Sequence, residues 1–182
     1  MLRALHDLHN IGYVHRYIRP QIFAIGQGEK CRTGNSTVYL TDFDLAWKFI
    51  DEKTKTHKPP GTRRFIDSIC YASMKSHMCQ ELSRRDDLES WLYLSLELFD
   101  RQHLAWHDVT IAETVLNKKK NFAKNPDPKI FQKLALQYRL IMEHIMALSF
   151  DDAPEYPRLF ALIAEAAKSL NVDFTSPYDW EP

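Results

Sequence analysis

Residues 12–23 read Gly-Tyr-Val-His-Arg-Tyr-Ile-Arg-Pro-Gln-Ile-Phe, a polar loop between two apolar stretches. Residues 13–15 and 22–25 are rich in aromatic and β-branched side chains, so each stretch predicts a short strand. The charged side chains and Pro20 between them predict a loop, because proline cannot donate to a strand ladder. The fold class of the chain depends on this loop and on what surrounds it.

An amphipathic helix is predicted before the loop, over residues 1–10. Leu2, Leu5 and Leu8 recur there every three residues, which places them on one helical face. The segment begins without a capping side chain, as if the chain had been entered partway through an element.

Beyond the loop, residues 38–40 predict another short strand, which follows a polar, glycine-containing stretch over residues 26–37. The motif Thr41-Asp42-Phe43-Asp44 comes next. Residues 48–61 are charged and end in Pro-Pro-Gly, so they predict an exposed loop.

Helices are predicted through the second half of the chain. Ser83-Arg84-Arg85-Asp86 has the spacing of a capping box, and the residues that follow to Phe99 are apolar on nearly every face. We expect such a helix in the middle of the domain. Thr110-Ile111-Ala112-Glu113 predicts a second capping box, which opens a short helix ending at the lysines 118–120.

A long helix and a last helix complete the pattern. Asp127 and Pro128 form a cap and first-turn pair for the long helix. Its one apolar face is made by Phe131, Leu134, Tyr138, Ile141, Ile145 and Leu148. The last helix carries Leu159, Ile163, Ala166 and Leu170.

The composition predicts one compact domain over residues 1–182. Of the 182 residues, 45% are hydrophobic and 26% charged, which suits a domain that buries about 70% of its unfolded surface. Lys plus Arg and Asp plus Glu number 24 each, so net charge gives no reason to expect nucleic acid or a membrane surface as a partner. Cys31, Cys70 and Cys79 contain no CxxC pair, which predicts reduced thiols in an intracellular protein, cytoplasmic or also nuclear.

The loop resembles the His-Arg-Asp-x-Lys-Pro-x-x-Asn catalytic loop of protein kinases, with three departures. Tyr17 stands in the slot of the catalytic aspartate, Arg19 replaces the lysine, and Ile22 stands where a metal-binding asparagine is expected. The residues that match are His15, Arg16 and Pro20.

Further blocks, in the family's order, carry the same resemblance. Asp42-Phe43-Asp44 resembles the Asp-Phe-Gly magnesium motif. Tyr71-Ala72-Ser73 and the Ser-Arg-Arg-Asp-Asp-Leu-Glu-Ser segment at residues 83–90 resemble the casein kinase 1 family, and residues 150–156 and 177–181 its tau tubulin kinase-like branch. The resemblance covers nearly all of the chain but only the C-terminal lobe of the family's fold. It implies a fold that is mainly α with a small β component, with the N-terminal lobe absent.

Kinase chemistry makes the departures matter. Phosphoryl transfer needs a group that orients the attacking hydroxyl and oxygen ligands that hold magnesium. A phenol, which ordinarily has a pKa of about 10, is a poor proton acceptor, so Tyr17 replaces the aspartate badly. Loss of the aspartate costs about 3–5 kcal/mol of barrier lowering. Ile22 has no lone pair for a cation. Asp42 is a remnant metal ligand, and Asp44 is either a second ligand or, in the favoured interpretation, a solvated substitute for glycine.

The nucleotide site is also incomplete by this comparison. Kinases cover ATP with a Gly-rich loop and hold it with a strand lysine. The five glycines form no G-x-G-x-x-G, since Cys31 stands where a third glycine would follow Gly26 and Gly28. ATP and magnesium are therefore expected only if the missing lobe is supplied.

The resemblance implies structural roles for three residues. In the family, His15 and Phe43 belong to a packed column of side chains. Asp87 matches the aspartate of the central helix, whose carboxylate accepts hydrogen bonds from the backbone of the catalytic loop. These roles need no catalysis.

Two rival sites are weaker. His103 and His107 lie one helical turn apart, as in zinc proteases, but Leu104 replaces the catalytic glutamate, so a packing role is favoured over metal binding. Cys70 and Cys79 lie near His77 in sequence without a base-plus-acid arrangement for a thiol nucleophile.

Three hypotheses about function stay open at this point. The favoured one is a catalytically impaired kinase-like lobe, a pseudokinase, that binds protein partners. The second is a truncated serine/threonine kinase that keeps weak, ATP-dependent phosphotransfer when joined to the missing lobe. The third is a remnant that folds poorly, because removal of one lobe exposes the apolar surface it covered.

Overall fold

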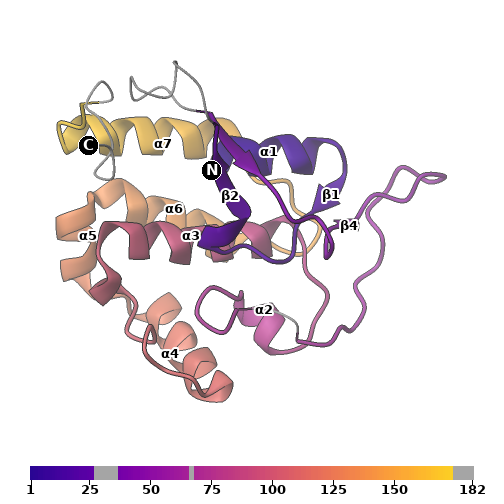
Figure 1. The fold of residues 1–182 in the computed structure, drawn as a ribbon, viewed down its shortest axis with the longest axis horizontal. Coiled ribbons are helices and arrows are strands. Elements are labelled where there is room, and N and C mark those ends of the chain that lie inside the picture. Colours follow the sequence, from indigo (N-terminus) through magenta and orange to yellow (C-terminus); the bar gives the residue numbers. More distant parts are fainter. Residues whose placement is uncertain (27–36, 66–67, 174–182) are drawn as a thin grey trace.

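The computed structural model describes residues 1–26, 37–65 and 68–173 (Figure 1). The described helices are α1 (Leu2–Asn10), α2 (Met74–His77), α3 (Arg84–Phe99), α4 (Ala112–Lys124), α5 (Pro128–Leu134), α6 (Leu136–Ala147) and α7 (Tyr156–Ser169). The strands are β1 (Tyr13–Val14), β2 (Phe23–Ile25), β3 (Val38–Leu40) and β4 (Trp47–Lys48), and the short 3-10 helices are η1 (Pro20–Ile22) and η3 (Arg101–His103). A mainly helical architecture with a small β component was expected and is confirmed. Gly28, Cys31 and the block at 177–181 lie outside the described residues.

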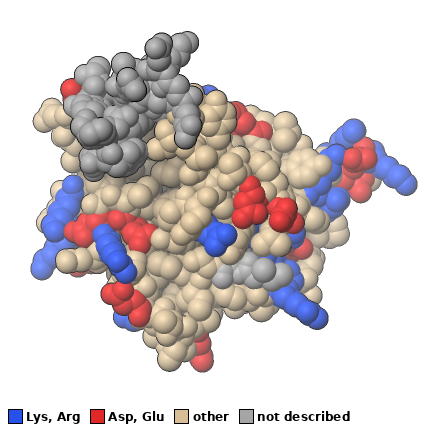
Figure 2. Space-filling view, in the orientation of Figure 1, with Lys and Arg blue, Asp and Glu red and all other residues tan. Residues whose placement is uncertain are grey.

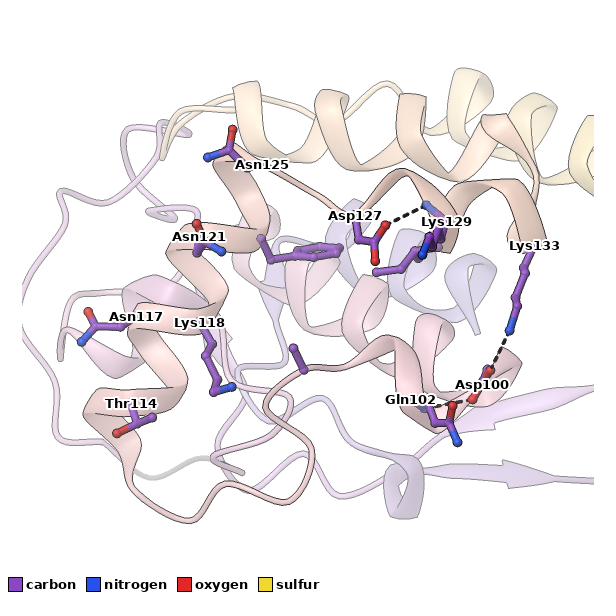
Figure 3. Close-up of a pocket in the computed structure, with 13 residues that line it drawn as sticks. Asp100, Gln102, Thr114, Asn117, Lys118, Asn121, Asn125, Asp127, Lys129 and Lys133 are labelled. Atoms are coloured by element: carbon purple, nitrogen blue, oxygen red, sulfur yellow. Dashed lines mark hydrogen bonds and ion pairs between the residues drawn. The ribbon is translucent and has the colours of Figure 1, made fainter.

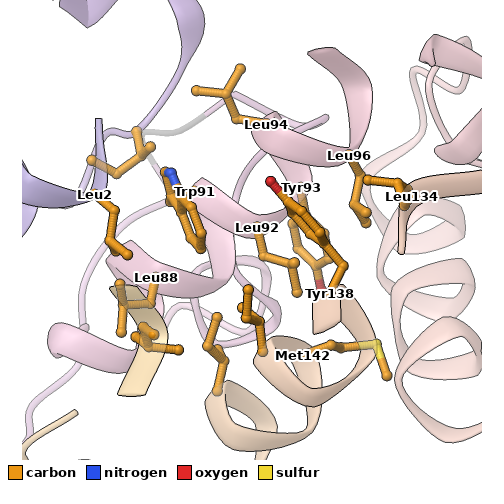
Figure 4. Close-up of a cluster of buried hydrophobic side chains, with 14 of the residues drawn as sticks. Leu2, Leu88, Trp91, Leu92, Tyr93, Leu94, Leu96, Leu134, Tyr138 and Met142 are labelled. Carbon is orange, nitrogen blue, oxygen red and sulfur yellow. The ribbon is translucent and has the colours of Figure 1, made fainter. Parts of the chain in front are cut away.

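Helix α3 runs through the middle of the molecule (Figure 1). Its residues from Asp86 to Leu96 are all buried, which confirms the prediction of a central helix. Helices α1 and α6 pack on α3, and α7 packs on α6. Their side chains meet in one core, where Leu2 of α1 and Tyr138 of α6 approach the side chains of α3 (Figure 4). Within the described residues no helix is long and apolar enough to span a membrane.

Capping side chains fix where two helices begin. At the start of α3, Asp86 accepts a hydrogen bond from the Ser83 backbone N–H at 2.9 Å, in a capping box. At the start of α5, Asp127 accepts one from the Lys129 backbone N–H at 2.9 Å, and Pro128 lies in the first turn. Both predicted caps are confirmed, and each contributes roughly 1 kcal/mol to stability.

The single long helix predicted after Asp127 is wrong. The chain forms α5 and then α6, and Ala135 between them has a φ of 95°. A positive φ cannot continue a right-handed helix and is strained for alanine. The apolar spacing nevertheless runs through the break, with Leu134 and Tyr138 buried on either side of it. Periodicity therefore gave no sign that the helix is interrupted.

The predicted limits of the preceding helix are also wrong. Helix α4 begins with Ile111 in the cap position and without a side-chain cap, so Thr110 does not cap it. The helix continues past the lysines at 118–120 to Lys124. Lys119 is fully buried rather than solvated at a helix end.

Two small antiparallel sheets hold the polar loop. Strand β1 pairs with β4, with Val14 opposite Trp47, and β2 pairs with β3, with Phe23 opposite Leu40. Ile22 belongs to η1 rather than to β2, and α2 is not among the predicted elements. The exposed loop predicted for residues 48–61 is wrong at its start, because Phe49 is buried. The projecting part of that loop does carry charges of both signs (Figure 2).

Candidate functional site

The loop after β1 is anchored to the central helix by the carboxylate of Asp87. Its Oδ2 accepts a hydrogen bond from the His15 backbone N–H at 2.6 Å, and its Oδ1 accepts one from the Arg16 backbone N–H at 2.8 Å. Arg16 has a φ of 68°, a left-handed conformation that turns the loop. Two successive backbone donors therefore fix the loop against α3.

A buried hydrogen-bond chain continues from Asp87 to the last helix. His9 Nε2 lies 2.9 Å from Asp87 Oδ2, and His9 Nδ1 is hydrogen-bonded to the Tyr156 hydroxyl. Burial raises the pKa of Asp87, but the hydrogen bond and charge of His9, followed by the charge and backbone N–H of His15, together outweigh it. That pKa therefore lies below its ordinary value. Burial, followed by the charge of Asp87, raises the pKa of Tyr156, which stays protonated. The chain joins α1, α3 and α7 behind the loop.

Tyr17, Arg19 and Asp42 form a group at the loop. The Arg19 guanidinium carbon lies 4.2 Å from the centre of the Tyr17 ring, at cation–π distance. Arg19 Nη2 lies 3.7 Å from Asp42 Oδ2. The two charged side chains are 32% and 40% exposed, so their ion pair is partly solvated and weak. A cation of the protein itself thus faces the Asp42 carboxylate.

Ile22 is fully buried, and its backbone holds the segment that leads to Asp42. The Ile22 carbonyl accepts hydrogen bonds from the Thr41 backbone N–H at 2.9 Å and from the Thr41 hydroxyl at 3.0 Å. His15 Nε2 lies 3.0 Å from the Thr41 carbonyl oxygen. The Ile22 side chain therefore belongs to the core and not to the surface beside Asp42.

Phe43 and His15 contact each other, with ring centroids 5.6 Å apart. His15 is fully buried, whereas Phe43 is 49% exposed. The two rings therefore meet at the edge of the molecule, with one side of Phe43 open to solvent. Asp44 is exposed as well.

The Arg16 side chain connects the loop to the segment before α3. Its Nε donates to the Leu45 carbonyl at 2.7 Å, and its Nη1 lies 3.1 Å from Glu81 Oε1. Glu81 is a contact that sequence reasoning missed. Its place two residues before the capping Ser83 is the one available signal, and it is a weak one.

The residues at the loop do not fit a magnesium ion. Magnesium requires oxygen ligands in near-octahedral geometry. Asp42 supplies one carboxylate, which Arg19 already faces, while Tyr17 offers a phenol in place of a carboxylate and Ile22 no side-chain oxygen. In the described ranges, no three His, Cys, Asp or Glu side chains gather as ligands.

The described residues of the two rival sites are explained by packing, ion pairs and burial. Leu104 and Trp106 are buried, and His107 Nε2 lies 2.6 Å from Glu97 Oε1. The side chain of His103 is outside the described part of the structure. Burial is the main cause that raises the pKa of Cys70 to about 11, which leaves little nucleophilic thiolate. Cys79 is an exposed free thiol.

Lys119 is a buried cation that sequence reasoning missed. Its Nζ donates to the Ala72 carbonyl at 2.6 Å and to the Ile69 carbonyl at 3.1 Å, and it lies 3.2 Å from His77 Nε2. Burial, followed by the Lys119 charge, lowers the pKa of His77 to about 4, so the neutral ring accepts the ammonium hydrogen bond. The signal in the sequence is helical spacing with two buried residues of the same face, Val115 and Phe122.

Comparison with known proteins gives relatives over the whole chain. It is 31% identical over 181 residues to a probable serine/threonine-protein kinase of Dictyostelium discoideum, covering 100% of this chain and 35% of that protein. It is 30% identical over 179 residues to a putative serine/threonine-protein kinase of Caenorhabditis elegans, covering 98% of this chain and 52% of that protein. It is 28% identical over 184 residues to casein kinase I homolog 1 of Saccharomyces cerevisiae, covering 99% of this chain and 34% of that protein. No protein-family model matches the chain.

The chain belongs to the protein kinase superfamily and is casein kinase 1-like. Its mainly helical architecture is that of the C-terminal lobe, as the sequence predicts. The chain spans about a third to a half of the length of these relatives. The narrower resemblance to the tau tubulin kinase-like branch stays a prediction.

Proposed function

We propose that this chain is a kinase-like domain that does not transfer phosphate by the route of its family and that acts by binding a protein partner. The group formed by Tyr17, Arg19 and Asp42 carries this proposal. In that group a phenol stands in place of a carboxylate, and the Arg19 guanidinium lies beside the one carboxylate that is left, that of Asp42.

Three residues of the loop, Tyr17, Arg19 and Ile22, each oppose phosphoryl transfer for a different reason. Tyr17 provides no carboxylate to orient a substrate hydroxyl, and such groups contribute about 10²–10⁴-fold to the rate, or about 3–5 kcal/mol. Arg19 holds a positive charge 3.7 Å from Asp42 Oδ2, where it competes with magnesium for the carboxylate. Ile22 is buried and has no side-chain oxygen.

The binding role is supported by how the loop is held. Asp87 fixes the loop through two backbone hydrogen bonds, and these contacts do not require catalysis. A lobe that keeps this framework presents a defined surface for recognition. Because the formal net charge is zero, we propose a protein as the partner rather than nucleic acid or a membrane. The cysteines without a CxxC pair favour an intracellular, cytoplasmic setting.

Isothermal titration of the purified chain with Mg-ATP tests the loss of the family's route. The Tyr17→Asp/Ile22→Asn double variant is titrated beside it. We expect no heat of binding from the wild-type chain and no transfer of labelled phosphate to a Ser/Thr peptide. Heat from the double variant alone would attribute the loss to these two residues, and no heat from either would attribute it to the whole cleft. Magnesium-dependent transfer that Asp42→Ala abolishes would overturn the proposal.

A second candidate function is a serine/threonine kinase that works only together with a separate nucleotide-binding lobe. The observation in its favour is coverage, since this chain matches 35% and 52% of the first two relatives. On this alternative, transcript sequencing upstream of the Met1 codon finds an in-frame Gly-rich loop and a strand lysine. The joined protein then shows magnesium-dependent transfer that the shorter chain lacks.

A further inference from the structure

A groove of about 660 Å³ lies between α4, α5 and η3 (Figure 3). Its volume is within the range of ligand-binding sites in proteins. None of its lining residues belongs to the loop after β1, so it is separate from the site described above. Its apolar surface includes the ring of Phe122, which is almost fully buried, and the side chain of Ile130.

One wall of the groove carries a row of amides. Asn117 and Asn121 lie one turn apart on α4, and Asn125 directly follows the last residue of that helix (Figure 3). All three are exposed, and their side-chain amides have no hydrogen-bond partner among the described residues. Four residues of helix rise about 6 Å, and two residues of an extended peptide rise about 6.6 Å. Each amide can donate and accept, so the row matches the N–H and C=O groups of alternate peptide units.

The charges around the groove favour an anionic ligand. Lys118 and Lys129 line it, and neither has a carboxylate partner in the described part of the chain. The groove lining holds three lysines, Lys118, Lys129 and Lys133, against two carboxylates, Asp100 and Asp127, so positive charge is in excess. Asp127 accepts the Lys129 backbone N–H at 2.9 Å, and Asp100 accepts a backbone N–H at 2.9 Å and lies 3.8 Å from Lys133 Nζ.

We propose that this groove binds an extended, acidic peptide segment of a partner protein. The amides of Asn117, Asn121 and Asn125 hydrogen-bond to the peptide main chain, and Lys118 and Lys129 pair with its carboxylates. The inference rests on the proposed function in taking a protein as the partner. Its test uses no nucleotide, so peptide binding and the loss of phosphotransfer can each fail alone.

Fluorescence anisotropy with the purified chain tests the proposal. The probe is a fluorescein-labelled peptide of about eight residues, alternating Asp and Ser, which extends over roughly 26 Å. Low ionic strength keeps the charge pairs from being screened. We expect this peptide to bind at least about tenfold more tightly than a Lys-Ser peptide of the same length. Methylation of alternate backbone nitrogens is expected to weaken binding by about tenfold, through lost hydrogen bonds.

Matched variants separate the amides from the charges. Asn117→Ala/Asn121→Ala removes two amides while favouring the helix, and we expect it to weaken binding about tenfold or more. Lys118→Gln/Lys129→Gln is expected to abolish the preference for the acidic peptide. Lys120→Gln, on the same helix but outside the lining, serves as the control and should bind as the wild type does. No binding by the wild-type chain, or equal binding by the double asparagine variant with its helical circular dichroism intact, would overturn the proposal.

Discussion

Asp87 keeps its charge inside the protein because three donors surround its two oxygens. The backbone N–H groups of His15 and Arg16 and the ring of His9 all lie within 2.9 Å of the carboxylate. Asp87→Asn turns one of these acceptor positions into a donor that faces another donor. We expect it to lower the free energy of unfolding by about 3–5 kcal/mol, as when one partner of a buried ionic network is removed.

Urea denaturation measures the effect of the Asp87 substitution. Asp44→Asn is the matched control, because Asp44 is exposed and its substitution should change stability by less than about 0.5 kcal/mol. Equal effects of the two substitutions would show that the Asp87 contacts carry no stability.

The pKa of Asp86, the neighbouring residue, is shifted upward by folding, whereas the pKa of Asp87 is shifted downward. Burial first, and then the charge of Glu89, raise its pKa to about 6 from 3.8. A carboxyl group whose pKa is raised by folding favours the folded state most below its unfolded pKa, and this contribution is lost as pH rises through the folded pKa. Between pH 4 and 6, stability should therefore fall by roughly 2 kcal/mol relative to Asp86→Asn, which does not titrate. Denaturation of both proteins at several pH values checks this, and parallel stability curves would contradict it.

Helix α4 is joined to the segment before α2 by the buried ammonium of Lys119. Its hydrogen bonds to the Ala72 and Ile69 carbonyls satisfy two backbone acceptors that would otherwise lack that donor. Lys119→Met keeps an apolar chain of similar length but removes the donor. We expect a loss of about 2 kcal/mol in the free energy of unfolding, measured by urea denaturation. Lys120→Met, one residue along the same helix and exposed, should cost less than about 0.5 kcal/mol, and a similar cost at both positions would argue against the buried contact.

The elements that sequence could predict are those with strong local signals. The capping box at Ser83 and the apolar residues on nearly every face of the segment after it were enough to place α3 in the core. Ala135 shows the limit, because its φ of 95° interrupts the helix where no glycine, asparagine or proline marks a turn. The burial of Lys119 was missed for a similar reason, since a run of three lysines normally indicates a solvated surface.

The candidate site was also predictable from the sequence only in part. The resemblance identified Tyr17 and Ile22 as departures, because motif positions can be aligned from the sequence alone. The ion pair between Arg19 and Asp42 joins residues far apart in sequence, and their approach depends on the pairing of β2 with β3. Sequence order gives no measure of that distance. The row of amides had a visible four-residue spacing, but its meaning depends on the groove beside it.

At the scale of the whole molecule, the open question is whether a lobe of this kind unfolds in one cooperative transition. The buried side chains of α1, α3, α6 and α7 form a single cluster that includes Trp91 and Trp106. We therefore expect one cooperative transition, with tryptophan fluorescence and far-ultraviolet circular dichroism changing at the same urea concentration. Leu92→Ala, at a fully buried position, should lower the free energy of unfolding by about 2–5 kcal/mol.

The control for that core substitution lies on the same helix. Leu98 is 63% exposed, so Leu98→Ala should cost less than about 0.5 kcal/mol. Because both substitutions remove the same atoms, the difference between them measures burial in α3 and not the identity of the side chain. Transitions that separate between the two probes, or equal costs at positions 92 and 98, would favour a remnant that folds poorly. A single transition with unequal costs would show that the core around α3 is stable enough to support a binding surface without catalysis.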